Sequence, residues 1–162
     1  MDCRKCSLAA MLAIFVAASG CAPAVDLTKT LRLDDVSTGW VAVGVVNGQN
    51  KVVPALTLKL TNASDQTLST LQLNAVFRRI DQEREWGTGF MTAAGSGGLA
   101  PAASTAMLLL KSERGYTGAD PAPALLGNSA FVDARVDVFA KYGATGWARV
   151  GAFPIRRVLI AR

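Results

Sequence analysis

The sequence contains no histidine, and all three of its cysteines lie within the first 21 of its 162 residues. Histidine is the commonest general base, the commonest transition-metal ligand and the usual partner of a serine or cysteine nucleophile. Its absence excludes Ser-His-Asp and Cys-His mechanisms and leaves carboxylates as the remaining acid–base groups. Residues 22–162 contain no thiol, so they cannot form an internal disulfide.

The sequence also lacks a large basic cluster. Its formal net charge is +5, and its adjacent basic residues occur only in pairs such as Arg78-Arg79 and Arg156-Arg157. A nucleic-acid binder carries a larger basic patch, so no nucleic acid is expected as a partner. The length allows one domain with its own core, because a chain of this size buries about two thirds of its unfolded surface.

Residues 1–20 have the pattern of a secretory signal peptide. The basic pair Arg4-Lys5 precedes an apolar run over residues 8–18, and small residues end the segment. The run is too short to span a membrane, and the small residues are typical of a cleavage site. We expect this segment to be removed, together with its two cysteines, whose C-x-x-C spacing would otherwise suggest redox or metal chemistry.

The motif Ala18-Ser19-Gly20-Cys21 resembles the lipobox of a bacterial lipoprotein precursor. The resemblance implies cleavage before Cys21 and lipidation of its thiol, which anchors a protein stably when more than one acyl chain is attached. In double-membraned bacteria, an alanine after the lipidated cysteine, in place of aspartate, implies the periplasmic face of the outer membrane. The alternative is an ordinary signal peptide that leaves Cys21 as a free thiol.

Two alternating segments within residues 55–80 dominate the rest of the chain. Leucines alternate with polar residues over 56–61, and apolar residues alternate with polar ones over 71–78. A period of two predicts strands with one apolar face, and the polar residues 62–66 between them favour a turn. The sequence therefore predicts a β-hairpin. Asn62-Ala63-Ser64 also matches a glycosylation acceptor, which we interpret as part of that turn.

Further strands are predicted on both sides of this hairpin. Residues 21–37 show no sustained hydrophobic period, so we predict that the lipidated cysteine is followed by a flexible tether. One short strand within the tether, at 30–33, is the alternative for those residues. The domain is expected over 38–162, with a strand ended by the turn pair Asn47-Gly48 and a single helical turn at 124–126. Its other predicted strands are 40–46, 86–91, 105–110, 131–140 and 147–160, the last interrupted at Pro154.

About seven strands without a long helical period predict an all-β, antiparallel sandwich behind a signal helix and a tether. The strand with V-x-V-x-V before a hairpin with asparagine at its turn resembles an immunoglobulin-like domain of uncharacterised bacterial lipoproteins. The cysteine pair and core tryptophan of antibody domains are absent. A small closed β-barrel is the main rival.

Three groups of charged residues are candidate sites. The first group consists of alternating carboxylates, Asp81, Glu83 and Glu85, which would share one face of a strand. They could form a calcium site or a glycosidase-like pair. The neighbouring arginines favour the alternative, a solvated charged turn. The pair Asp34-Asp35 lies in the expected tether. The third group is an exposed stripe on one strand, formed by Asp133, Arg135 and Asp137. Opposite charges from Lys59 or Arg78 could lie across from this stripe on a neighbouring strand. We predict no catalytic residue, metal or cofactor.

The aromatic residues are the remaining candidates for a binding site. Trp86 and Trp147 lie next to turns, and Tyr116 lies in the longest loop beside Arg114. Exposed aromatics on a rigid scaffold would form a sugar-stacking or protein-docking surface. The interpretation that we favour is that the tryptophans, with Trp40, close the ends of the core.

The sequence thus predicts a lipid-anchored interaction or structural module of the bacterial cell envelope. It would not be an enzyme, and its partners would be the membrane, through the lipid, and an unknown envelope protein, such as a component of a transport complex. A carbohydrate- or lipid-binding module that uses exposed aromatics is the alternative. A carboxylate-based hydrolase is a third hypothesis.

Overall fold

The computed structural model describes residues 23–160. The predicted signal peptide and Cys21 lie outside the described residues. Within them the chain forms eight strands and two short helices, in the order α1 (Leu27–Thr30), β1 (Leu31–Val46), β2 (Gln49–Asn62), β3 (Leu71–Arg79), β4 (Glu85–Ala94), β5 (Leu108–Lys111), β6 (Tyr116–Gly118), α2 (Ala122–Gly127), β7 (Ala134–Lys141) and β8 (Ala148–Pro154).

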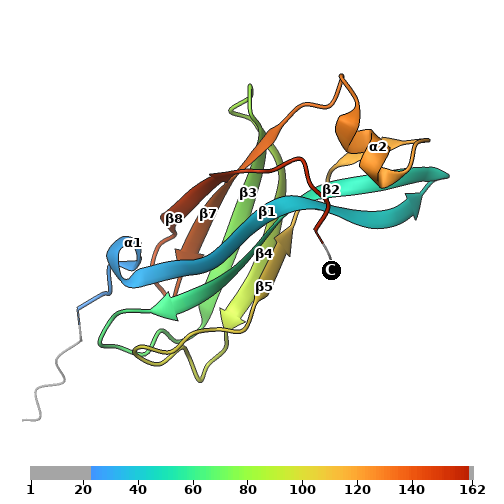
Figure 1. The fold of residues 1–162 in the computed structure, drawn as a ribbon. Coiled ribbons are helices and arrows are strands. Elements are labelled where there is room, and N and C mark those ends of the chain that lie inside the picture. Colours follow the sequence, from blue (N-terminus) through green and yellow to red (C-terminus); the bar gives the residue numbers. More distant parts are fainter. Residues whose placement is uncertain (1–22, 161–162) are drawn as a thin grey trace, which may run out of the picture.

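The strands form two antiparallel sheets (Figure 1). In the first sheet the order is β1-β2-β5, and β6 also pairs with β2; in the second it is β4-β3-β7-β8. This arrangement confirms the predicted all-β, antiparallel two-sheet architecture. The sheets do not join into one closed sheet within residues 23–160, so the rival prediction of a closed barrel is wrong.

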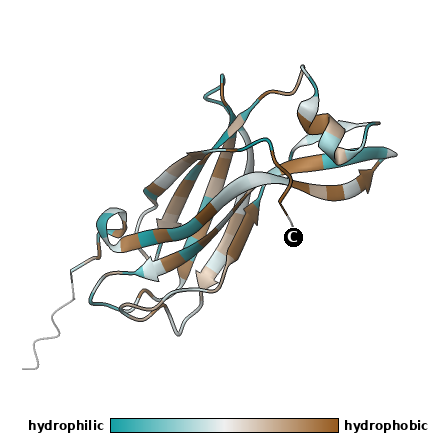
Figure 2. Ribbon diagram, viewed as in Figure 1, coloured by the Kyte–Doolittle hydropathy of each residue, from teal (hydrophilic) through white to brown (hydrophobic). Residues whose placement is uncertain are grey.

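The predicted hairpin over residues 55–80 is wrong, although both of its strands exist. β2 pairs with β1, β5 and β6, whereas β3 pairs with β4 and β7. The chain therefore crosses from one sheet to the other through residues 63–70, a connection longer than the usual hairpin loop of about two to five residues. Crossing lets the two apolar faces cover one another, and their side chains are fully buried: Leu56, Leu58, Leu60, Leu71, Leu73 and Phe77. Figure 2 shows the resulting alternation of hydrophobic and hydrophilic residues along the strands.

The folded part of the chain begins earlier than the predicted boundary at residue 38. Asp26 caps α1 by accepting a hydrogen bond from Thr28 N at 3.1 Å, and β1 then runs in register with β2 from Leu31 onward. Leu27 and Leu31 are buried in the main core. The segment expected to be a tether thus supplies a helical turn and half of a strand, because its scattered leucines find apolar partners only in the assembled fold.

The turn predicted at Asn47-Gly48 is confirmed. Both residues have positive φ, 52° and 77°, as a two-residue turn that matches the strand twist requires. The turn of the β1–β2 hairpin lies on the opposite side of the molecule from α1 (Figure 1), and β6 pairs with β2 close to that turn.

The last predicted strand, 147–160, ends early. β8 stops at Pro154, at the edge of its sheet, where a missing N–H is tolerated. Residues 155–160 then cross to the other sheet, where Trp40 N donates to Val158 O at 2.8 Å and Ile160 N donates to Trp40 O at 2.9 Å. Within the described residues, no helix has the length and apolar character needed to cross a membrane.

Candidate interaction surface

The aromatic residues form two groups. The first group, which contains Trp40, Trp86 and Tyr116, belongs to the core. Trp40 is fully buried. Its ring centroid lies 6.1 Å from that of Trp86 and 5.8 Å from that of Tyr116, and Phe131 completes the cluster at 4.6 Å. The four rings join β1, β4 and β6 to the start of the segment before β7. The favoured core interpretation is therefore confirmed for Trp40, while Trp86 is partly buried against it.

Tyr116 is held by backbone contacts as well as by rings. Its hydroxyl donates to Val132 O at 3.1 Å and accepts from Val132 N at 3.2 Å. The guanidinium of Arg79 lies 5.1 Å from the Trp86 ring and 5.6 Å from the Tyr116 ring, a spacing at which a cation is attracted to a ring face. Arg114 is exposed in the segment between β5 and β6. Trp86 and Tyr116 thus have a structural role, and they do not form an open docking face with Arg114.

Trp147 differs from the other tryptophans. It is 44% exposed and forms an edge contact with Phe90, which is 60% exposed, at a centroid separation of 6.3 Å. Lys141 Nζ lies 5.0 Å from the Trp147 ring. The interpretation that Trp147 closes the core is therefore wrong, because its ring packs against the exposed Phe90 and Lys141 on the solvent side of the sheet.

Strand register shows what surrounds this aromatic pair. Phe90 of β4 lies opposite Asn74 of β3, Asn74 lies opposite Phe139 of β7, and Phe139 lies opposite Arg149 of β8. Two residues along, Thr92, Gln72 and Lys141 form the neighbouring row. The Trp147 ring lies between the side chains of Lys141 and Phe90 and contacts both. We call these two rows the outer sheet face; it comprises Phe90, Asn74, Phe139, Arg149, Thr92, Gln72, Lys141 and Trp147.

Sequence reasoning missed Phe90 and Phe139. Phe90 lies between a glycine and a methionine, and Phe139 lies within the predicted strand 131–140. Their alternation with inward-facing residues was a signal that both point outward. Only the pairing of β3 with β4 and β7 places them on either side of Asn74.

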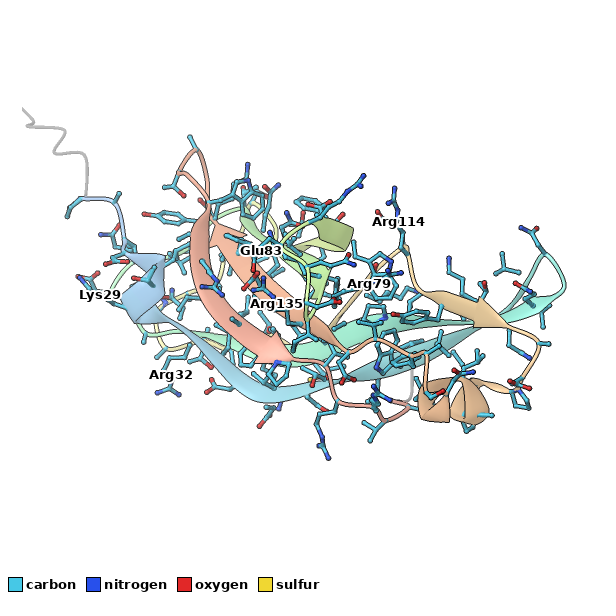
Figure 3. The ribbon with its side chains drawn as sticks, turned by 90° about the horizontal axis from the view of Figure 1, so that it is seen from above. Lys29, Arg32, Arg79, Glu83, Arg114 and Arg135 are labelled. Carbon is cyan, nitrogen blue, oxygen red and sulfur yellow. The ribbon has the colours of Figure 1, made fainter. Side chains whose placement is uncertain are left out.

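A charged cluster borders the outer sheet face. Asp137 is 5% exposed and accepts hydrogen bonds from Arg78 and Arg149. Arg135 lies 3.8 Å from the same carboxylate and 2.7 Å from Glu83 Oε1 (Figure 3). A carboxylate this deeply buried requires such charge-assisted partners.

The cluster corrects part of the predicted charged stripe. Arg78 forms an ion pair with Asp137, as predicted. Asp137 was predicted to be exposed but is buried, because arginine side chains cover it. Lys59 instead binds Asp35 at 2.8 Å, since it belongs to the other sheet. This ion pair and its hydrogen bond raise the pKa of Lys59.

The three alternating carboxylates remain in solvent. Asp81 and Glu83 are exposed in the turn between β3 and β4, and Glu85 is exposed at the start of β4. Glu83 binds Arg135. Across residues 23–160, no group of three or more histidine, cysteine, aspartate or glutamate side chains is placed to hold a metal ion.

No protein-family model matches the sequence, and no curated protein matches it. Among solved structures, the chain is similar to the solution structure of AT1g01470 from Arabidopsis thaliana. The two are 16% identical over 92% of each chain, with a TM-score of 0.44.

Proposed function

We propose that the protein is a lipid-anchored, non-enzymatic interaction module of the bacterial cell envelope, which holds another envelope component on its outer sheet face. The observation that carries the proposal is the exposure of Phe90 and Trp147 on a four-stranded sheet. Large aromatic side chains on a rigid scaffold are typical of binding surfaces. The other tryptophans are already used in the core.

The anchor follows from the lipobox-like motif at Cys21. The chain enters the domain at α1, at the end of the molecule opposite the β1–β2 hairpin (Figure 1). An anchor at that end would leave the outer faces of both sheets free to contact other envelope components. The two-sheet, antiparallel architecture is compatible with an immunoglobulin-like domain, and we propose that fold class here. We also propose that the protein is located at the periplasmic face of the outer membrane.

Crosslinking in intact cells tests the proposal. The full chain is expressed with its own signal segment, crosslinked, purified and examined by mass spectrometry, beside Cys21→Ser. We expect a defined set of envelope components that depends on Cys21 and that is lost in a Phe90→Ser, Trp147→Ser double variant. Met107→Ser is the matched control, since Met107 is 51% exposed and lies just before β5, a strand of the other sheet. A set unchanged by the double variant would refute the role of the outer sheet face.

Carbohydrate binding is a second candidate, and one observation favours it. The amide of Asn74 lies between Phe90 and Phe139 in the register of the sheet. Aromatic rings separated by an amide suit the mixed apolar and hydroxyl surface of a sugar better than a purely apolar protein contact.

A further inference from the structure

We infer that the outer sheet face binds an acidic glycan, a chain of sugars that carry carboxylate groups. This inference rests on the proposed function and narrows it, because it assumes that this face is the contact surface and names the chemistry of what it contacts.

The rings supply apolar platforms at a regular spacing. Phe90 and Phe139 are separated by one strand, β3, and neighbouring strands lie about 4.8 Å apart. The row from Phe90 to Arg149 therefore spans about 14 Å across four strands. The Trp147 ring continues the apolar surface beside this row, in edge contact with Phe90 at 6.3 Å. Such a flat strip accommodates successive units of an extended chain.

The amides supply uncommitted polar groups between the rings. Asn74 lies in the first row and Gln72 in the second, and both are partly buried. Among the described residues, no side chain or backbone group forms a hydrogen bond with either side-chain amide. Each amide offers two donors and an acceptor, which complement hydroxyl groups of a ligand whose apolar face contacts the adjacent rings.

The charges select an anionic ligand. Two cations, Lys141 and Arg149, belong to this face. Arg78 and Arg135 border it, beside the carboxylates Asp137 and Glu83 and, opposite Arg78 in the strand register, Glu85. Asp137 is covered by the guanidiniums that bind it, whereas the side chain of Arg149 remains 54% exposed. Arg149 ends the row of rings, so a carboxylate on a sugar stacked against Phe139 would meet its guanidinium, which binds carboxylates in a fork-like geometry.

A membrane surface fits the same residues less well. Contact with acyl chains requires a continuous apolar area, but polar side chains interrupt the aromatic ones in both rows. A neutral glycan would not use the positive charge of Lys141 or the exposed part of the Arg149 guanidinium. The combination of rings, amides and cations therefore favours an acidic glycan.

The test uses the full chain in detergent micelles and measures binding by calorimetry. The probe is an oligomer of galacturonate, and the matched neutral probe is its fully methyl-esterified form. Phosphatidylglycerol vesicles test the membrane as an alternative occupant. We expect the galacturonate oligomer to bind in a salt-sensitive manner, at least about tenfold more tightly than the ester.

Variants at the outer sheet face and matched control variants test whether the oligomer binds there. Phe90→Ser and Arg149→Gln are each expected to weaken binding about tenfold, through loss of a stacking ring and of a charged hydrogen bond. Met107→Ser and Lys111→Gln, exposed residues outside the two rows, should change affinity less than about twofold. Unfolding in urea verifies that each variant is folded.

The outcomes separate the inference from the proposed function. Equal binding of acid and ester, no binding of either, binding of vesicles alone, or an unchanged affinity of Phe90→Ser would each overturn the acidic glycan. If the anchored crosslinks still depend on Phe90 and Trp147 in any of those cases, the interaction module stands and only the chemistry of its ligand is wrong. If the crosslinks are lost as well, both proposals are wrong.

Discussion

The crossing of the chain from β2 to β3 depends on Asn62, and its replacement provides a direct test. Asn62 is the last residue of β2 and is fully buried. Its side-chain nitrogen donates to Gln66 O and to Leu99 O, both at 2.8 Å. Its side-chain oxygen accepts from Ser64 N at 3.0 Å and from Ser64 Oγ at 2.6 Å. The amide therefore joins the crossing segment to the loop after β4, and it cannot serve as a glycosylation acceptor in the folded protein.

The free energy lost in Asn62→Ala follows from these contacts. Each hydrogen bond contributes about 0.5–1.5 kcal/mol net, and buried groups left without partners cost more. With four such bonds removed, we expect a loss of about 3–4 kcal/mol in the free energy of unfolding. For a domain of this size that corresponds to a decrease of about 10 °C in Tm.

Asn62→Asp tests whether the donors are responsible. Aspartate keeps the shape and both contacts to Ser64, but its carboxylate would face the carbonyl oxygens of Gln66 and Leu99. Burial beside those oxygens disfavours the charged form, so the folded-state pKa of the new carboxyl lies above its unfolded value. The destabilisation is then greatest at neutral pH and decreases as the pH falls towards the ordinary aspartate range.

Urea denaturation followed by tryptophan fluorescence measures both effects, because Trp40 is buried and reports loss of the core. Gln66→Ala is the control, since it keeps the backbone oxygen and removes only an exposed side-chain bond to Pro23 O at 3.1 Å. Its effect should stay within about 0.5 kcal/mol. An Asn62→Ala variant as stable as this control would refute the reasoning, and so would an Asn62→Asp variant without the pH dependence.

Three further predictions concern other parts of the fold. Gly115→Ala should lose more than about 2 kcal/mol in urea denaturation, because an added Cβ would lie 1.9 Å from Val52 O and the backbones would have to separate; an unaffected midpoint would contradict this close approach. The hydrogen bond from Thr28 lowers the pKa of Asp26, so the cap of α1 is stable above the ordinary carboxyl range and is lost as the pH falls through the lowered value. The protection of the α1 amides, relative to intrinsic exchange at each pH, should therefore decrease in acid, and Asp26→Asn should remove that dependence. Asp137→Ala should cost about 3 kcal/mol in urea denaturation, because it leaves three arginines without their shared carboxylate; a loss below about 1 kcal/mol would contradict the buried cluster.

Much of the fold was predictable from local patterns. The alternation over residues 56–61 and 71–78 predicted β2 and β3 with the correct inward faces, because side-chain direction along a strand depends only on the backbone. Asn47-Gly48 predicted a turn because both residues tolerate positive φ. These predictions needed no knowledge of distant partners.

The pairing of strands was not predictable in the same way. A strand with one apolar face is equally satisfied by a neighbour in its own sheet or by a strand facing it across the core, so β2 and β3 were wrongly placed in one hairpin. The leucines of α1 and early β1 likewise had no local period, and their burial depends on residues far away in sequence. The site followed the same rule, since Trp147 was a candidate from the sequence but its neighbours on the outer sheet face were not.

The sequence by itself determined the positions of β2 and β3, which of their faces are apolar, the turn at Asn47-Gly48, and that histidine-dependent chemistry is excluded. These properties depend on residue type and on the geometry of the backbone nearby. Only the tertiary structure decided which strands share a sheet, that Trp40 is buried while Trp147 is exposed, and that Phe90, Asn74, Phe139 and Arg149 form one row. The physical reason is that pairing and burial depend on contacts between residues far apart in sequence, which form only when the whole chain packs.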